Sequence, residues 1–298
     1  MSRVPEPGGG MMDRVDGEPA PNTGVAAAHG GDPGVNSTSG GRHRYEAHLF
    51  GPFQVLRDGT RLGSPTWGRA SARTLLKWFL LNPGDKFREG ELAQVLWPGR
   101  KGGTANRLHV TQHSLRRVLQ PELCSRQPSA YVRSDACGRC WFDPAGNWWT
   151  DVDEVARLTK TARAAQAADR IPEAIGAYER LLAHYERGFL PEEVYLDAFE
   201  PFRVAHGRDH DEALRQLLRL NRRGGRHWEA LTYALRVLDR DPYAEEAAAA
   251  AVEIHLRQGS ITAALAQLES VTRALREDLG VPLGPELLAL RERVRQAR

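Results

Sequence analysis

The first regular pattern in the chain is an alternation of apolar and polar residues that starts at Tyr45. A period of two is typical of strands with one buried face. Asp58-Gly59 then marks a hairpin turn, because glycine tolerates the positive φ that such a turn requires. This segment therefore predicts short antiparallel strands, with apolar positions at Tyr45, Ala47, Leu49, Phe53, Val55 and Leu56.

Two stretches with helical spacing follow the predicted strands. In the first, apolar residues recur at helical intervals over residues 72–80, and Asn82-Pro83-Gly84 ends the pattern. The second is a short apolar stripe over residues 92–96, which Trp97-Pro98 ends. The pattern predicts two helices separated by a turn.

A third helix is expected over residues 105–119, with Thr104 as its N-terminal cap, because a threonine hydroxyl can accept a hydrogen bond from an otherwise unpaired backbone N–H group. Residues 131–133 and 140–142 then flank a turn that contains glycine, which predicts a hairpin. A short helix, a turn, a basic helix and a hairpin form the layout of a winged helix-turn-helix domain. The expected fold of this part is α+β.

From Asp151 onward the pattern is helical and shows a period of 34 residues. An earlier and less regular copy starts near Asp169. A 34-residue period, with small residues where paired helices touch, is the signature of an all-α tetratricopeptide-like helical repeat domain. A generic helical bundle is the alternative. Equivalent pairs are Gly225 and Gly259, Ala230 and Ala264, Leu231 and Leu265, and Val237 and Val271.

Charge divides the chain into three parts. Residues 1–43 are rich in glycine, proline, serine and aspartate, carry a net charge of −2 and are expected to form a disordered tail. Residues 44–150 hold 16 Lys or Arg against 8 Asp or Glu, a net charge of +8, whereas residues 151–298 carry −3. A basic segment between near-neutral ones suggests a polyanionic partner for that segment alone.

The remaining composition indicates a cytoplasmic protein. Apolar runs are too short to span a bilayer, so no membrane partner is expected, and the first residues lack the apolar core of a secretory signal. The 3 cysteines do not suggest a disulfide framework.

The third predicted helix has two distinct faces when it is drawn on a helical wheel. The side expected to face the core carries Ala105, Leu108, Gln112, Leu115 and Leu119. Arginine can bind guanine through two hydrogen bonds, asparagine and serine offer donors and acceptors, and valine can touch a thymine methyl group. The opposite side therefore suits a DNA major groove, with Asn106, Arg107, Val110, His113, Ser114 and Arg117 as candidate contacts.

Five further arginines are candidate contacts to the DNA backbone. Arg116 lies on the flank of the same helix, where it could reach a phosphate. Arg133 and Arg139 lie on the hairpin, the position of a wing. Arg69 and Arg73 lie at the start of the first helix, where backbone N–H groups already favour a phosphate. Each of these could equally be an ordinary surface arginine, and the whole helix could be an ordinary amphipathic helix.

Several motifs together carry a family resemblance. In the first half they are Leu49-Phe50-Gly51-Pro52-Phe53 with Asp58-Gly59, Glu91-Leu92 through Leu96-Trp97-Pro98, Ala105-Asn106 through Leu108-His109-Val110, and Leu115-Arg116-Arg117. In the second half they are Asp241-Pro242-Tyr243, Arg276-Glu277-Asp278-Leu279-Gly280-Val281 and Pro285-Glu286-Leu287. Over roughly residues 44–298, the chain resembles the Streptomyces antibiotic regulatory protein family.

The resemblance implies an OmpR-like winged helix joined to a bacterial transcriptional activator domain. It implies a transcription activator that binds direct repeats in double-stranded DNA and recruits RNA polymerase through its principal sigma factor, often at secondary-metabolite genes. Two departures stand out: Arg88 occupies a position where the family often has a capping Ser or Thr, and Cys137-Gly138-Arg139-Cys140 replaces the usual Gly and Tyr of the wing. The oligomeric state, including a homodimer on DNA, stays open.

Other chemical signals are weaker. Cys137 and Cys140 have the C-x-x-C spacing of zinc sites, but only Cys124, His109 and His113 are nearby as further ligands, so no metal is expected. His206, His210 and Asp211 are expected to lie on a solvated helix start rather than to bind a metal.

No catalytic set and no Walker-type loop is recognisable, so neither an enzyme nor a cofactor is expected. The main alternative to an activator is a helical-repeat adaptor whose winged domain binds protein. Single-stranded RNA binding is weaker still, because the candidate reading helix has few aromatic residues.

Overall fold

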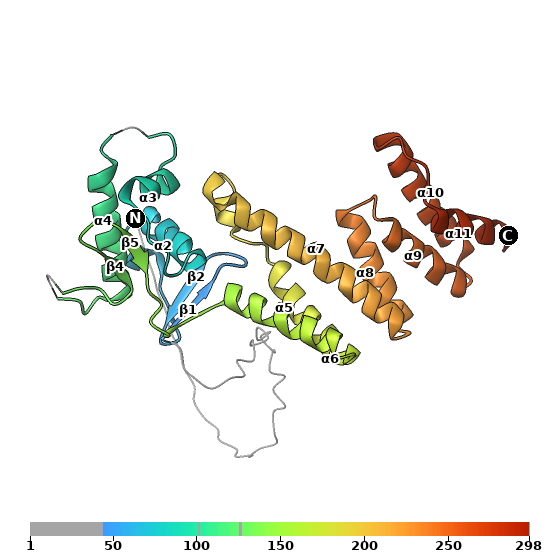
Figure 1. The fold of residues 1–298 in the computed structure, drawn as a ribbon, viewed down its shortest axis with the longest axis horizontal. Coiled ribbons are helices and arrows are strands. Elements are labelled where there is room, and N and C mark those ends of the chain that lie inside the picture. The colour runs from blue at the N-terminus through green and yellow to red at the C-terminus, as the bar shows by residue number, and fades with distance from the viewer. Residues whose placement is uncertain (1–43, 101, 125–126, 298) are drawn as a thin grey trace, which may run out of the picture. The chain divides into compact units, whose positions relative to one another are not determined.

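The computed structural model describes residues 44–100, 102–124 and 127–297, so the tail predicted over residues 1–43 lies outside the described residues. We call residues 44–150 the N-terminal module and residues 151–297 the helical module (Figure 1). No helix in these described ranges is long and apolar enough to cross a membrane.

A four-stranded sheet opens the N-terminal module, with the strand order β3-β2-β1-β6. The predicted hairpin joins β2 (Gln54–Arg57) to β3 (Thr60–Arg61). Asp58 and Gly59 both have positive φ, 50° and 78°, as a two-residue hairpin turn requires. Strand β1 (Tyr45–His48) pairs antiparallel with β2 and parallel with β6 (Trp148–Thr150).

Strand β6 was not anticipated from the sequence. It brings the end of the module back to its beginning, so that the Trp148 ring stacks on the Tyr45 ring with centroids 4.5 Å apart. Trp148 is buried in the core of the module. The parallel pairing places the first residue of the helical module directly beside β1.

The three predicted helices are present as α2 (Ala70–Leu81), α3 (Glu89–Leu96) and α4 (Thr104–Leu119). A short additional helix, α1 (Ser64–Trp67), precedes them. The predicted hairpin is also present: β4 (Val132–Ser134) pairs antiparallel with β5 (Cys140–Phe142). In Figure 1 the hairpin lies beside α4, the element that β4 contacts.

Two details of the helix ends differ from the prediction. Thr104 is the first residue of α4 rather than its cap, because Gly103 occupies the cap position with a left-handed backbone (φ 66°) and makes no side-chain hydrogen bond. At α3, the Glu91 carboxylate accepts a hydrogen bond from the backbone N–H of Arg88 (2.6 Å). Glu91 thus supplies one half of a capping box, while its own backbone N–H, the donor that a capping hydroxyl would satisfy, bonds to the Arg88 carbonyl at 3.1 Å.

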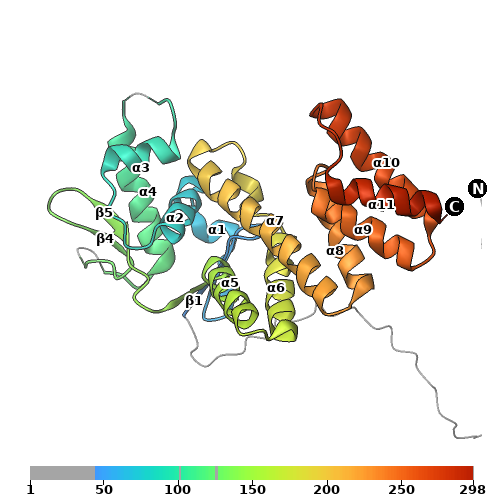
Figure 2. The same cartoon turned by 45° about the vertical axis from the view of Figure 1, so that its right-hand side comes forward.

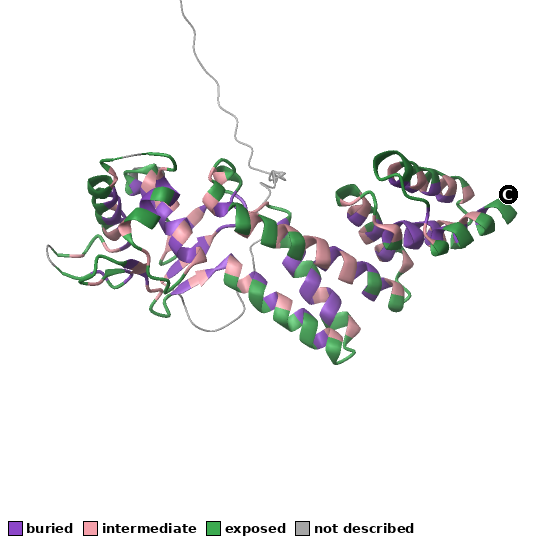
Figure 3. Cartoon of the chain, turned by 45° about the horizontal axis from the view of Figure 1, so that its top comes forward, coloured by how far each residue is buried: buried purple, intermediate pink, exposed green. Residues whose placement is uncertain are grey.

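The helical module consists of antiparallel helix pairs that pack on their sequence neighbours. Figure 2 shows α5, α6 and α7 side by side, and Figure 3 shows buried residues along their facing sides. Two short 3-10 helices, η1 (Pro191–Glu193) and η2 (Asp197–Phe199), precede α7. The helices are α5 (Asp151–Ala167), α6 (Ile171–Tyr185), α7 (Glu200–Arg223), α8 (His227–Arg240), α9 (Glu245–Arg257), α10 (Ile261–Asp278) and α11 (Pro285–Gln296).

The 34-residue period corresponds to repeated helix pairs. Gly225 and Gly259 follow the first helix of their pairs with φ of 70° and 68°, and Asp169 takes the same left-handed conformation (φ 58°) after α5. Ala230 and Ala264 are both fully buried where the second helix packs on the first. A left-handed residue at the turn and a small residue at the crossing are therefore the features that repeat.

The two modules share their apolar cores. Leu190 and Phe199 belong to the helical module but are buried in the core of the N-terminal module, and Phe50 is buried in the core of the helical module. The Asp151 carboxylate accepts the backbone N–H groups of Leu49 (2.8 Å) and Phe50 (2.9 Å). Burial raises the pKa of Asp151 to about 6, although these hydrogen bonds lower it. The boundary predicted between residues 150 and 151 thus passes through a continuous packed junction.

Candidate nucleic-acid interface

Helix α4 presents one buried and one open face, largely as the helical wheel predicts. Leu108, Gln112, Leu115 and Leu119 are buried, but Ala105 is exposed because it lies in the first turn, before the helix reaches the core. Thr111 and Val118 take part in the buried face instead. Among the candidate contacts, those with exposed side chains are Asn106, Arg107, Val110, His113 and Arg117.

Polar contacts on the inner side of α4 fix its rotation against α1 and α2. The hydroxyl oxygens of Thr111 and Ser71 lie 3.0 Å apart. The Ser114 hydroxyl donates to the backbone carbonyl of Trp67 (3.3 Å), beside Gly68, where an added Cβ would lie 3.6 Å from the same hydroxyl. Ser114 is thus already engaged at the α1 contact and lies at the border of the open face, not at its centre.

Arg107 and Arg117 are the strongest cationic candidates on the open face. Among the described residues, neither guanidinium group has a hydrogen bond or an ion pair, and both side chains are exposed. His109, by contrast, lies 3.3 Å from the Glu89 carboxylate on α3. Two unpaired arginines about three turns apart on one helical face provide charged donors for an anionic ligand.

Arg116 was expected to reach a DNA phosphate, but its side chain is bound to the hairpin. Its Nε donates to the Val132 carbonyl (3.1 Å), and an Nη contacts the Ser134 hydroxyl at 3.4 Å. The guanidinium group therefore links the last turns of α4 to strand β4 instead of pointing freely toward solvent. Arg116 is a positioning residue for the hairpin in this structure.

The tip of the β4–β5 hairpin is organised around Asp135. Its carboxylate accepts the backbone N–H groups of Cys137 and Arg139, both at 3.0 Å, and the Arg139 Nε at 2.9 Å. The hydrogen bond from the Arg139 backbone, together with its guanidinium group, lowers the pKa of Asp135. Arg133 similarly pairs with Asp143 at 3.1 Å. Both hairpin arginines are about half exposed and neutralised in part, so a phosphate would compete with a carboxylate for each.

The two arginines at the start of α2 differ in their surroundings. Arg69 is the exposed residue before the helix, and within the described part of the chain its side chain has no polar partner. Arg73 instead pairs with Glu192 of the helical module (3.2 Å) and lies over the Phe53 ring. Arg73 therefore belongs to the junction, and the geometry does not favour it as a phosphate contact.

Lys86 is an additional cation near the hairpin that the sequence patterns did not single out. The Lys86 ammonium lies 4.5 Å from the centroid of the Trp141 ring, a cation–π contact that holds an exposed lysine beside β5. Backbone hydrogen bonds between Phe87 and Cys140 (2.8 and 2.9 Å) place this segment next to the hairpin. No local sequence signal connects Lys86 with Trp141, because their proximity depends on this long-range pairing.

Neither the cysteine pair Cys137 and Cys140 nor the cluster of His206, His210 and Asp211 forms a metal site in the part of the chain that the structure describes. Cys137 is exposed, whereas Cys140 is buried in the core, and burial raises the pKa of its thiol to about 11. His206, His210 and Asp211 were expected at a solvated helix start, but this was wrong: they lie well inside α7, and Asp211 pairs with Arg240 of α8. The ring centroids of His206 and Phe189 lie 4.3 Å apart, and those of His210 and Tyr185 lie 5.2 Å apart. Both histidines therefore face neighbouring aromatic rings.

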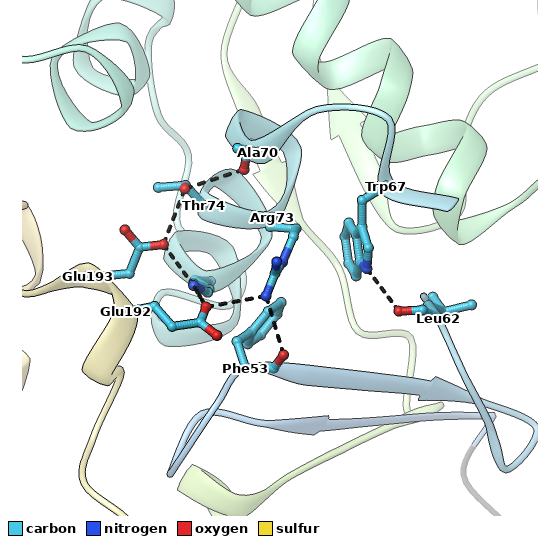
Figure 4. A network of polar contacts seen from close by, with 9 residues as sticks. Phe53, Leu62, Trp67, Ala70, Arg73, Thr74, Glu192 and Glu193 are labelled. Atoms are coloured by element: carbon cyan, nitrogen blue, oxygen red, sulfur yellow. Dashed lines mark hydrogen bonds and ion pairs between the residues drawn. The ribbon is translucent and has the colours of Figure 1, made fainter. Parts of the chain in front are cut away.

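A buried lysine, Lys77, links the two modules through ion pairs with Glu192 and Glu193, a group that we call the Lys77 clamp. Lys77 of α2 is almost fully buried, and its Nζ contacts the Glu193 carboxylate at 2.7 Å and that of Glu192 at 3.0 Å. The Thr74 hydroxyl also reaches Glu193 at 3.3 Å (Figure 4). Partial burial opposes ionisation of Glu192, yet the hydrogen bond from Lys77 and the charges of Lys77 and Arg73 hold its pKa below the usual value.

One family model matches residues 150–295, just under half of the chain. The family is the bacterial transcriptional activator domain. The matched segment begins at Thr150, which caps α5 by accepting the Asp153 backbone N–H, and it includes the two glutamates that pair with Lys77. The junction is therefore a contact between the segment that matches this family and the module that carries α4.

A solved structure of Mycobacterium tuberculosis EmbR, in complex with a low-affinity phosphopeptide, has a similar fold, with a TM-score of 0.70 at 22% sequence identity. The alignment covers 86% of this chain and 66% of the EmbR chain, so this chain spans just under two thirds of that structure's length. No curated protein matches the sequence significantly.

Proposed function

We propose that the chain is a sequence-specific transcription activator. In this proposal the N-terminal module is an OmpR-like winged helix-turn-helix domain, with α4 in the major groove of double-stranded DNA and the β4–β5 hairpin as the wing. The activator domain, a tetratricopeptide-like repeat, contacts RNA polymerase through its sigma factor. The protein acts in the cytoplasm, at secondary-metabolite promoters, and performs no catalysis.

The observation that carries the proposal is the open face of α4. It presents Arg107 and Arg117 without polar partners in the described residues, together with Asn106, Val110 and His113. The module around it has a net charge of +8, while the module behind it has −3 over residues 151–298. An exposed helix with unpaired arginines and a strong positive field is what reading of base edges requires.

The remaining cationic residues fall into two groups: those that would contact DNA phosphates and those that hold neighbouring parts of the protein in place. Arg69 is exposed and suits a phosphate contact, and Arg133 and Arg139 can exchange their carboxylate partners for phosphates at the wing. Arg116 supports the wing from α4, and Arg73 supports the junction. We therefore expect Arg116 to act through the position of the hairpin.

The shared cores give the activator domain a fixed attachment to the reading module. Because Leu190 and Phe199 complete the core around α2, a DNA-bound N-terminal module holds the start of the activator domain in one place. Full-length protein is the appropriate form for every test, since a fragment that ends at residue 150 lacks these two side chains.

The test has two stages, both with the full chain. Duplexes selected from a random pool should converge on a sequence motif that contains repeated half-sites. A promoter with this motif should then give more transcript with RNA polymerase and its principal sigma factor when the chain is added. The double variant Arg107→Ala, Arg117→Ala should select no motif and give no activation.

Two results would contradict the proposal. Failure to enrich any sequence at low salt would favour an adaptor whose N-terminal module binds protein. Full activation by the double variant would show that activation does not depend on the open face of α4.

A further inference from the structure

The helical module contains a basic cavity although its overall charge is negative. The cavity has a volume of about 400 Å³ and lies where the end of α7 meets α8 and α9. Four arginines and a histidine line it against a single glutamate. The lining residues are Arg219, Arg222, Arg223, His227, Glu253, Ile254 and Arg257.

The carboxylate in this cavity is shared between two arginines. Glu253 accepts one hydrogen bond from Arg222 at 3.1 Å and another from Arg257 at 2.9 Å. An Nη of Arg257 also lies 3.4 Å from the His227 Nε2. Arg219 and Arg223 pair with Glu246 and Asp169, acids that do not line the cavity. All four arginines thus have a carboxylate partner, but four guanidinium groups face only three carboxylates, so one positive charge stays unbalanced.

A second cavity of about 460 Å³ shares one lining residue, Arg223, with the first. It lies between α5, α6 and α7 and contains a chain of polar side chains. The Tyr178 hydroxyl donates to Gln166 (3.3 Å), Gln166 donates to Gln216 (2.9 Å), and Gln216 donates to Glu212 (2.6 Å). Each glutamine amide retains a further N–H for an incoming ligand.

We propose that these two cavities form one groove that binds an extended, acidic peptide segment of a protein partner. Acidic side chains of the peptide compete with Glu253 and Asp169 for Arg222, Arg223 and Arg257, because arginine binds carboxylates through paired hydrogen bonds. The peptide backbone runs along the row of glutamine amides. Stacked helix pairs commonly build such concave binding surfaces.

Charge favours a peptide over a nucleic acid as the occupant. Asp209 and Glu212 line the glutamine end of the groove, and Glu253 lies within the arginine end. A phosphate backbone has a negative charge at every nucleotide and would meet these carboxylates along its whole length. A peptide can place its acidic residues only at the arginine end. This site is separate from α4, so the groove proposal and the DNA proposal can fail independently.

The test is a selection of short random peptides, displayed on phage, with the full chain as bait. Aspartate and glutamate should be enriched among the bound peptides. A labelled synthetic copy of an enriched peptide should show saturable binding by fluorescence anisotropy. Replacing its acidic residues with Asn and Gln should weaken binding about tenfold or more, since charge-assisted hydrogen bonds are lost.

Variants locate the binding site. Arg223→Gln and Arg257→Gln should each weaken the acidic peptide, and Arg223→Glu should shift the selection toward lysine and arginine. Arg226→Gln is the matched control, because Arg226 is exposed, pairs with Glu229 and does not line either cavity. Circular dichroism should show the same unfolding midpoint for all four proteins, since these side chains are on the surface.

Three results would overturn the groove proposal. One is a selection without enrichment of acidic residues. Another is an acidic peptide that binds equally well to the Arg223 and Arg257 variants. The third is a loss of duplex affinity in these variants without any peptide binding, which would assign the arginines to nucleic acid.

Discussion

Removal of the Lys77 ammonium group should destabilise the junction between the modules more than removal of a surface ion pair does. The Lys77 side chain is 2% exposed, and its Nζ lies 2.7 Å from Glu193 and 3.0 Å from Glu192. At an effective dielectric constant of about 20, the attraction to each carboxylate is about 6 kcal/mol. Burial of the ammonium group offsets much of this in the intact protein.

The variant Lys77→Met keeps an unbranched apolar side chain but removes the ammonium group, so that Glu193 loses its cation while Glu192 keeps Arg73. Loss of one partner of a buried ion pair costs about 3–5 kcal/mol, because the other charge is left uncompensated. We therefore expect the free energy of unfolding to fall by about 3 kcal/mol, the lower end of this range, because Glu193 is 13% and Glu192 39% exposed to water. Addition of Glu193→Gln should recover part of the loss, since the neutral amide no longer needs a counter-charge.

Urea unfolding of the full chain, followed by circular dichroism, measures this effect. Arg73→Ala is the matched control, because Arg73 contacts the same Glu192 from a side chain that is 31% exposed. Such partly exposed pairs contribute about 0–1 kcal/mol. If Lys77→Met costs no more than Arg73→Ala, the clamp does not hold the modules together and the reasoning is wrong.

Three further predictions concern packing, pH and the hairpin. Ala264→Leu should destabilise the helical module by about 1–3 kcal/mol in urea unfolding, since Ala264 is fully buried at a helix crossing, whereas the exposed Ala266→Leu should change little. Burial lowers the pKa of His206 below 6.5, so below this pH the unfolded chain takes up a proton that the folded chain resists. Stability from His206 is therefore lost as the pH falls, and His206→Phe should become more stable relative to the wild type between about pH 7 and pH 5; a constant difference would contradict this. Arg116→Ala should weaken binding to all duplexes in gel-shift titrations through a looser hairpin, and unchanged binding would show that Arg116 does not position it.

Local patterns in the sequence were sufficient for most elements. The apolar spacing over residues 72–80 and 105–119 predicted α2 and α4, and Asp58-Gly59 predicted the β2–β3 turn. The repeat was found because the turn glycines and the buried alanines recur at a fixed spacing. The turns and helices are set by residues within a few positions of one another, and the repeat shows itself because the same local pattern returns after 34 residues.

Long-range contacts explain what the sequence did not reveal. Strand β6 exists because it pairs with β1, about a hundred residues earlier, and three residues are too few for a local pattern. Arg116 and Arg73 resemble free surface arginines in the sequence, but the fold brings Val132 and Glu192 within their reach. Lys77 gives no local sign that two glutamates of another module will cover it. Side chains on α4 were placed better because helical periodicity alone decides which face is open.

The most direct test of the central proposal is a salt titration of duplex binding by the full chain. Binding should weaken linearly in a log–log plot against salt, because the cations release counterions from the phosphates. On the selected sequence, Arg107→Ala and Arg117→Ala should each cost about 1–3 kcal/mol, and much less on a scrambled duplex. Arg133→Ala should weaken both duplexes alike and flatten the salt slope. A flat salt response, or equal losses for the α4 and hairpin variants on both duplexes, would contradict the assignment of α4 as the reading helix.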